Sequence, residues 1–183
     1  ASSAADAGGS EKLIRQKLIE TQDIEAIVSI GNNFFYTKSL ACHVWFFNKN
    51  KKDKETILMI NGKDVFRRVN QKINDFSDDQ LNGLTNILKF YRGEKVNFKQ
   101  NEWLLKNFPN GKYEDVEGLC KITSKNEIIE NEFSLLPGRY VGYTYKFDAN
   151  LNYSEEISKI KNELNILDEE NSKLTKDLNN LKI

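Results

Sequence analysis

The residues of this chain best suited to chemistry are three consecutive aromatic side chains, Phe34, Phe35 and Tyr36. Gly31 and two asparagines precede them, which indicates a polar loop. Three adjacent rings on a loop are hard to bury together, and exposed rings stack on flat ligands such as a nucleic-acid base. Alternatively, one or two of the rings close the end of a sheet. The residues alone leave both interpretations open.

No other segment carries a self-sufficient active site. The sequence has no glycine-rich phosphate loop after a strand, no HExxH or GxSxG motif and no plausible cysteine–histidine pair. His43 lies in an apolar run, which indicates a hydrogen-bonded core histidine rather than a base or a metal ligand. Cys42 and Cys120 lack metal-ligand spacing, so we expect reduced thiols in a cytoplasmic protein.

Acidic and basic residues are equal in number over the whole chain, but basic residues cluster in one segment. The formal net charge is zero, which gives no sign of nucleic-acid binding but can hide a local basic face. A basic cluster beside Phe66 consists of Lys63, Arg67, Arg68 and Lys72. It could contact phosphates or form a solvated loop. No apolar run is long enough for a membrane span, and the first residues do not resemble a signal peptide.

Hydrophobic patterning predicts an α/β fold in the first third of the chain. A helix beginning at Ser10 precedes strands at 24–30, 40–47 and 56–60. The run at 40–47 is almost wholly apolar, which predicts that both of its faces are covered. Because a polar turn joins it to the strand at 56–60, we expect these two to pair antiparallel at a sheet edge. The layer that covers such a sheet comes either from outside this chain or from its own later helices.

The middle of the chain is predicted to be mostly helical or irregular. A capping-box pattern at Ser77 begins a helix that runs to Tyr91. Shorter helices are predicted at 102–107 and from Ser124 onward.

A heptad pattern dominates the last part of the chain, where apolar residues and one asparagine recur at alternating steps of three and four. The a positions are Ile157, Leu164, Asn171 and Leu178, and the d positions are Ile160, Leu167, Leu174 and Leu181. This seam predicts a coiled coil or a long bundle helix, in which Asn171 can fix the register by meeting another asparagine. The alternative is a helix that folds back onto its own domain.

Four stretches together resemble one known family. They are residues 30–37, 44–49, 113–121 and 136–142. In this order, and over nearly the whole chain, they are similar to the C-terminal part of the modification (M) subunit of type I restriction-modification systems, an adenine-N6 DNA methyltransferase. The opening residues 1–10 also resemble a loop of that family, the one that leaves the strand after the catalytic motif.

The resemblance implies a division of the chain. We expect an α/β fold with the C-terminal half of a Rossmann-like methyltransferase sheet at 1–62. A mostly helical or irregular region at 63–148 and a coiled-coil helix for subunit assembly at 149–183 would follow. The family binds S-adenosylmethionine at a glycine loop and engages a flipped adenine with an Asn-Pro-Pro-Phe motif. Both lie upstream of this sequence in the family, so we expect a fragment without catalytic residues that binds no cofactor by itself.

The resemblance also implies roles and partners. Phe34 and Phe35, followed by Tyr36, are expected to stack on the target adenine of DNA. The heptad helix is expected to dock on the specificity (S) subunit or on a second M subunit, and a restriction (R) subunit completes the assembly. The other hypothesis is a stand-alone structural module that pairs through its heptad helix and has no enzymatic activity.

Overall fold

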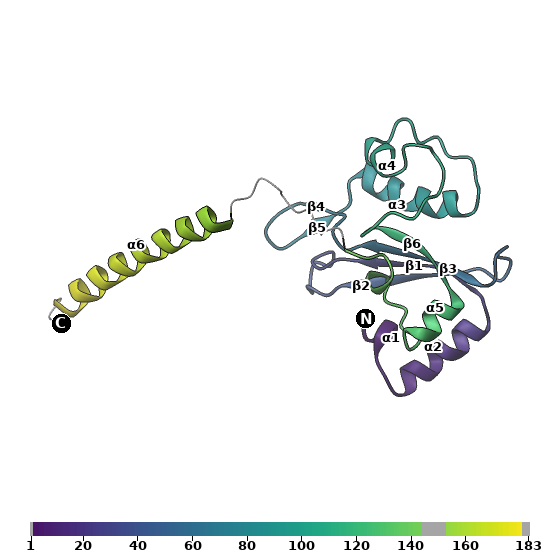
Figure 1. Cartoon of the computed structure of the whole chain (residues 1–183), viewed down its shortest axis with the longest axis horizontal. Helices are drawn as coiled ribbons and strands as arrows, with labels where there is room; N and C mark the ends of the chain where they lie inside the picture. Colours follow the sequence, from purple (N-terminus) through teal and green to yellow (C-terminus); the bar gives the residue numbers. More distant parts are fainter. Residues whose placement is uncertain (1, 144–152, 181–183) are drawn as a thin grey trace. The chain divides into compact units, whose positions relative to one another are not determined.

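The chain divides into two compact units, residues 1–144 and residues 145–183. A computed structural model describes residues 2–143 and 153–180 (Figure 1). The first unit contains a four-stranded sheet with helices on both faces, and the described part of the second unit is one helix. None of the helices in the described ranges is long and apolar enough to cross a membrane.

The sheet of the first unit is mixed. Its strands are β1 (Ile24–Ile30), β2 (Cys42–Phe47), β3 (Thr56–Gly62) and β6 (Cys120–Ser124), in the spatial order β2-β1-β3-β6. Strands β1 and β3 are parallel, whereas β2 and β6 run antiparallel to their neighbours. The predicted α/β character is therefore confirmed, and the middle region contributes β6 to the same sheet.

The predicted antiparallel pairing of residues 40–47 with residues 56–60 is wrong. Strand β1 lies between the two, antiparallel to β2 and parallel to β3. The physical reason is a buried ammonium group in the connection between β2 and β3. The Nζ of Lys51 donates to the carbonyl oxygen of Ile24 at 2.7 Å and to that of Thr56 at 2.5 Å. The connection therefore crosses the amino end of β1 instead of forming a tight hairpin.

Helices from the middle region cover one face of the parallel pair. Helix α3 (Asp78–Tyr91) and helix α4 (Glu102–Asn107) lie on this side of the sheet (Figure 1). Ile87 of α3 belongs to a buried cluster with Ala26 and Leu58. The missing layer over β1 and β3 thus comes from later helices of the same chain, which was one of the two alternatives.

The opposite face is covered by elements from both ends of the first unit. These are α1 (Ser2–Asp6), α2 (Ser10–Glu20), α5 (Lys125–Glu130) and the short 3₁₀ helix η1 (Pro137–Arg139). A second buried cluster forms here and includes Ile19, Ile27, Met59 and Ile128. Because this cluster joins α2 to α5, the two ends of the unit stabilise each other through the sheet.

Strand β2 is less well covered than its sequence predicts. It pairs with β1 on one side only and is one of the two edge strands of the sheet. The side chains of Val44, Phe46 and Phe47 are exposed, so the prediction that both faces of this run are covered is wrong for the described residues. An apolar edge strand with this exposure is a surface on which further protein can pack.

The predicted helix boundaries of the middle region are confirmed. Ser77 caps α3 in a capping box with Gln80, whose side-chain nitrogen also donates to the carbonyl oxygen of Phe66 at 3.1 Å. Asn101 caps α4, and Ser124 caps α5. Several short elements were not predicted: the hairpin of β4 (Arg67–Arg68) and β5 (Asn74–Asp75) that precedes α3, strand β6, the helix η1, and α1, where the sequence resembled a loop.

The described part of the second unit is α6, a helix of 28 residues (Tyr153–Asn180). The apolar seam residues whose side chains are described are exposed. They are Ile157, Ile160, Leu164, Leu167 and Leu174, and Asn171 is exposed with them. The side chain of Leu178 and the whole of Leu181 lie outside the described residues. The predicted helix is confirmed, and its pairing with another helix stays a prediction.

Among the ion pairs formed by the described residues of the first unit, Glu25 at the amino end of β1 is the most deeply buried carboxylate, with 3% of its side chain exposed. Its oxygens accept hydrogen bonds from Arg92 Nε at 3.0 Å, from an Arg92 Nη at 2.5 Å and from Asn48 Nδ2 at 3.1 Å. The hydrogen bonds from Arg92 are the main reason that the pKa of Glu25 lies below its ordinary value. This pair joins β1 to the residue that follows α3.

Replacing Glu25 with Gln should lower the free energy of unfolding by about 1–3 kcal/mol at pH 7, because the charged hydrogen bonds with Arg92 are lost. A lowered carboxylate pKa stabilises the fold above the unfolded-state pKa, about 4.3 for Glu, and this stabilisation is lost as pH falls through the folded-state value. Urea denaturation of both proteins at pH 7 and at pH 3 should therefore show a difference that shrinks on acidification. Glu132→Gln, which breaks the exposed pair with Lys12, is the control and should change stability little. A difference between the Glu25 variant and the original that is as large at pH 3 would contradict this account.

Candidate functional site

The aromatic loop, residues 31–39, connects β1 to β2 at the carboxyl end of the parallel strands. Phe35 and Lys38 form an antiparallel bridge, which places Tyr36 and Thr37 at the tip of a two-residue turn. Asn33 has a φ of 67°, a left-handed conformation that asparagine tolerates better than most residues. The loop is therefore a defined turn that projects its tip from the sheet.

The three consecutive rings differ in how far they are exposed. Phe34 is half-buried, and the centroid of its ring lies 4.5 Å from that of Phe76. Phe35 is 48% exposed and Tyr36 is 90% exposed. One ring thus anchors the loop and two rings are accessible, so the two interpretations left open by the sequence apply to different members of the same run.

The aromatic loop is fixed to the segment that follows β3. The backbone N–H of Asn74 donates to the carbonyl oxygen of Asn33 at 2.8 Å, and its side-chain Nδ2 donates to that of Asn32 at 3.1 Å. A Cβ on Gly31 would lie 2.4 Å from the carbonyl oxygen of Lys63, so only glycine permits this approach. The loop and the β4–β5 hairpin therefore form one surface.

The supporting role of Phe76 was not predicted. A signal was present, because an apolar residue directly before an N-cap such as Ser77 commonly packs near the fourth helical position, here Leu81. Phe76 and Leu81 line the same cavity. The pattern could have predicted where Phe76 lies but not that Phe34 would rest on it, since that contact joins segments about forty residues apart.

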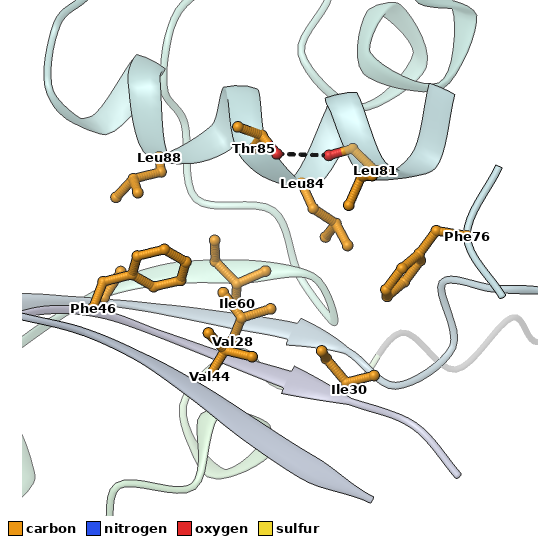
Figure 2. A pocket seen from close by; sticks show the side chains of 11 residues that line it. Val28, Ile30, Val44, Phe46, Ile60, Phe76, Leu81, Leu84, Thr85 and Leu88 are labelled. Carbon is orange, nitrogen blue, oxygen red and sulfur yellow. Dashed lines mark hydrogen bonds between the residues drawn. The ribbon is translucent and has the colours of Figure 1, made fainter. Parts of the chain in front are cut away.

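This apolar cavity, of about 210 Å³, lies between α3 and the face of β1, β2 and β3 that α3 covers (Figure 2). Phe76 and Phe46 lie at opposite ends of it (Figure 2). Thr85 is the only residue of its lining with a polar side chain, and its hydroxyl donates to the carbonyl oxygen of Leu81 at 2.8 Å. Without free polar groups the cavity cannot orient a base or a cofactor by hydrogen bonds, but it can accept apolar side chains.

His43 has the hydrogen bond expected of a core histidine. Its Nδ1 lies 3.0 Å from the Oγ of Ser29, a buried residue of β1. Burial, followed by the nearby charge of Lys63, lowers the pKa of the imidazole. A neutral, half-buried ring bonded to a serine matches the prediction made from its apolar surroundings.

The two cysteines are free thiols, as expected. Burial raises the pKa of the Cys120 thiol to about 11, so it is protonated and unreactive at neutral pH. Within residues 2–143 and 153–180, no group of histidine, cysteine or acidic side chains has the arrangement of a metal site.

The described residues do not fit the cofactor that the resemblance implies. Strand β1 runs into the aromatic loop and β3 into the hairpin, and neither leads through a glycine-rich turn into a helix in this part of the chain. The glycine that follows β1, Gly31, is packed against the Lys63 carbonyl. We therefore assign none of these residues to S-adenosylmethionine.

Comparison with known proteins decides the family. The profile of the N-6 DNA methylase family matches residues 3–148. The chain belongs to this family. The match includes the aromatic loop, the hairpin and the cavity. Together with the relatives described next, it confirms the predicted resemblance to type I modification subunits.

The individual relatives of this chain are named as methylase subunits of type I restriction enzymes. The chain is 28% identical over 171 residues to the MjaIX methylase subunit of Methanocaldococcus jannaschii, covering 89% of this chain and 28% of that protein. It is also 28% identical over 152 residues to the HindI methylase subunit of Haemophilus influenzae, covering 82% of this chain and 30% of that protein. The chain therefore spans less than a third of the length of these relatives.

A solved structure supports the fold. The methyltransferase subunit of the type I restriction-modification system from Streptococcus thermophilus aligns with a TM-score of 0.60 at 22% sequence identity. The alignment covers 76% of this chain and 25% of that chain. The mixed sheet and its helices are thus similar to part of a methyltransferase fold.

Phe34 should contribute to stability, whereas Tyr36 should not. Phe34→Ala removes a half-buried ring from its contact with Phe76 and should lower the free energy of unfolding by about 1–2 kcal/mol. Tyr36→Ala removes a ring that is almost fully exposed and should change it by less than about 0.5 kcal/mol. Urea denaturation measures both values. Equal effects of the two substitutions would show that Phe34 does not anchor the loop.

Proposed function

We propose that this chain is part of a site-specific adenine-N6 DNA methyltransferase subunit of a type I restriction-modification system, and that its aromatic loop stacks on the target adenine. The observation that carries the proposal is the accessibility of Phe35 and Tyr36 on a loop anchored by Phe34. The methylase subunits to which the chain is similar support the enzyme class.

The chemistry explains why such a loop is needed. The N6 amine of adenine is paired inside the duplex, so the base must leave the stack before the amine can accept a methyl group. An extruded base loses the stacking of its neighbours, and an aromatic face replaces part of that energy. S-adenosylmethionine would supply the methyl group, held by regions of the enzyme other than the residues described here.

The exposed apolar surface beside β2 supports the view that this chain completes a larger domain. The outer edge of β2 is unpaired in the described structure, and the apolar cavity opens next to Val44 and Phe46. We propose that its occupant is the remaining part of the methyltransferase domain, contributing a strand to the edge and apolar side chains to the cavity. The length of the relatives is consistent with such a further part, since the chain covers only 28–30% of the two methylase subunits.

The seam of α6 supports a role in assembly. Five apolar seam residues and Asn171 are exposed along one described helix, which leaves a heptad surface for a partner. We propose that this partner is the specificity subunit, with the restriction subunit joining the larger complex. A stand-alone module that pairs through α6 is the second candidate, and the same exposed seam is the observation that favours it.

Phe35→Leu in the complete enzyme should reduce kcat/KM for DNA methylation about 5- to 150-fold, the range expected when a base loses about 1–3 kcal/mol of stacking. Tyr36→Leu is expected to act in the same direction. Phe35→Tyr keeps an aromatic face and is the matched control, which should retain most activity. Transfer of labelled methyl groups to a duplex containing the target measures the rates, and size-exclusion chromatography checks that assembly is intact. If both leucine variants methylate DNA at the original rate, the aromatic loop does not stack on the target adenine.

Deleting residues 151–183 should abolish binding to the specificity subunit, because the heptad seam is lost. The double variant Leu164→Lys, Leu167→Lys should do the same without truncation, since it places charges on the seam. Asn165→Lys, outside the seam on the same helix, is the control. Co-purification with a tagged specificity subunit is the measurement. If the seam variants still co-purify but no longer associate with a second modification subunit, α6 joins modification subunits instead.

A further inference from the structure

The β4–β5 hairpin next to the aromatic loop is strongly basic in a chain of zero net charge. The two segments, residues 31–40 and 63–76, together contain five basic and two acidic residues. The basic residues are Lys38, Lys63, Arg67, Arg68 and Lys72, and the acidic residues are Asp64 and Asp75. Because the rest of the chain compensates this excess, the positive charge is concentrated beside the exposed rings.

The two adjacent arginines of β4 lie in different environments. Arg67 is paired across the hairpin with Asp75, which accepts from its Nε at 2.9 Å and from an Nη at 2.6 Å. Asp78 adds a further negative charge near Arg67. The charge of Arg67 is thus compensated. Arg68 makes no side-chain hydrogen bond or ion pair with the described residues, so its charge is available to a ligand.

Strand alternation places Arg68 on the same face of the hairpin as the side chain of Asn74. Successive side chains of a strand point to opposite faces, and directly paired residues of neighbouring strands share a face. Arg68 is paired with Asn74, whose side chain donates to the carbonyl oxygen of Asn32 in the aromatic loop. Arg68 therefore shares a face of the hairpin with the side chain that contacts the aromatic loop, and Arg67 lies on the opposite face.

Two further cations complete this surface. Lys38 is the bridge partner of Phe35, so its side chain shares a face with that exposed ring. Lys72 is exposed in the turn of the hairpin, which is ordered by hydrogen bonds from Val69 N and Asn70 N to the carbonyl oxygen of Ile73. Both lysines lack side-chain partners among the described residues.

We propose that Arg68, Lys72 and Lys38 form a phosphate-binding surface that holds the DNA backbone on either side of the adenine stacked on the aromatic loop. Cations beside accessible rings are the combination that binds an unstacked nucleotide, since the rings take the base and the cations take its phosphates. The contacts depend on charge and are independent of base sequence. This inference rests on the proposed function and deepens it by naming the part of DNA that the hairpin contacts.

The test compares Arg68→Gln with Arg67→Gln, which removes the same charge from the opposite face. The 183-residue chain is titrated with a fluorescein-labelled duplex of about 20 base pairs carrying one unpaired adenine, over a series of salt concentrations, and anisotropy gives the association constant. Each phosphate contact contributes about 0.9 to the slope of log K against log salt concentration for duplex DNA. Arg68→Gln should reduce the magnitude of the slope by about 0.9 and Arg68→Gln with Lys72→Gln by about 1.8, whereas Arg67→Gln should leave it unchanged.

The outcomes separate this inference from the proposed function. Equal slopes for the Arg67 and Arg68 variants, or no binding by the original chain at low salt, would overturn the phosphate surface, even if Phe35 proved necessary for methylation. If the salt slope of the chain depends on Arg68 but methylation by the complete enzyme does not depend on the aromatic loop, the phosphate surface is supported and base stacking is refuted. Circular dichroism of each variant confirms that the exposed substitutions leave the fold intact.

Discussion

The parallel pairing of β1 with β3 is the constraint on which the rest of the structure depends. Parallel strands cannot be joined by a tight turn, and they need cover on both faces. Strand β2 and the connection that carries Lys51 therefore pass around β1, while α3 and the α1–α2 and α5 layer bury the two faces. Because both strands run in the same direction, the segments that leave them emerge together, and the aromatic loop meets the hairpin there.

Local patterns predicted the elements well and their arrangement poorly. Capping residues such as Ser77 and Ser124 act on the nearest turn of a helix, so the boundaries of α3 and α5 could be read from neighbouring residues. The order of the strands depends on contacts between distant segments, and the pairing of 40–47 with 56–60 failed because a buried lysine is an unusual structural element. The apolar run in β2 indicated burial that the described residues do not provide by themselves.

The same limit applies to the site. The sequence identified Phe34, Phe35 and Tyr36 as a group, but three identical signals in a row could not distinguish an anchor from an exposed face. That distinction comes from the contact of Phe34 with Phe76, a residue that follows both β3 and the hairpin in the sequence. Likewise, the basic cluster could not be resolved into compensated and free charges until the register of β4 with β5 was known. The match to the N-6 DNA methylase family gives these local details a common context.

The alternation of Arg67 and Arg68 has a consequence for how this protein can vary. The two faces of a two-residue strand are distinguished only by odd and even positions, so one inserted or deleted residue in β4 would exchange them. Arg67 would then take the face of Asn74 and lose its pairing with Asp75, and Arg68 would move to the opposite face, although the charged residues of the hairpin stay the same. The hairpin can therefore tolerate substitution at many positions more readily than a change in its length. The number of residues in β4, and not the net charge of the hairpin, decides which arginine pairs with Asp75.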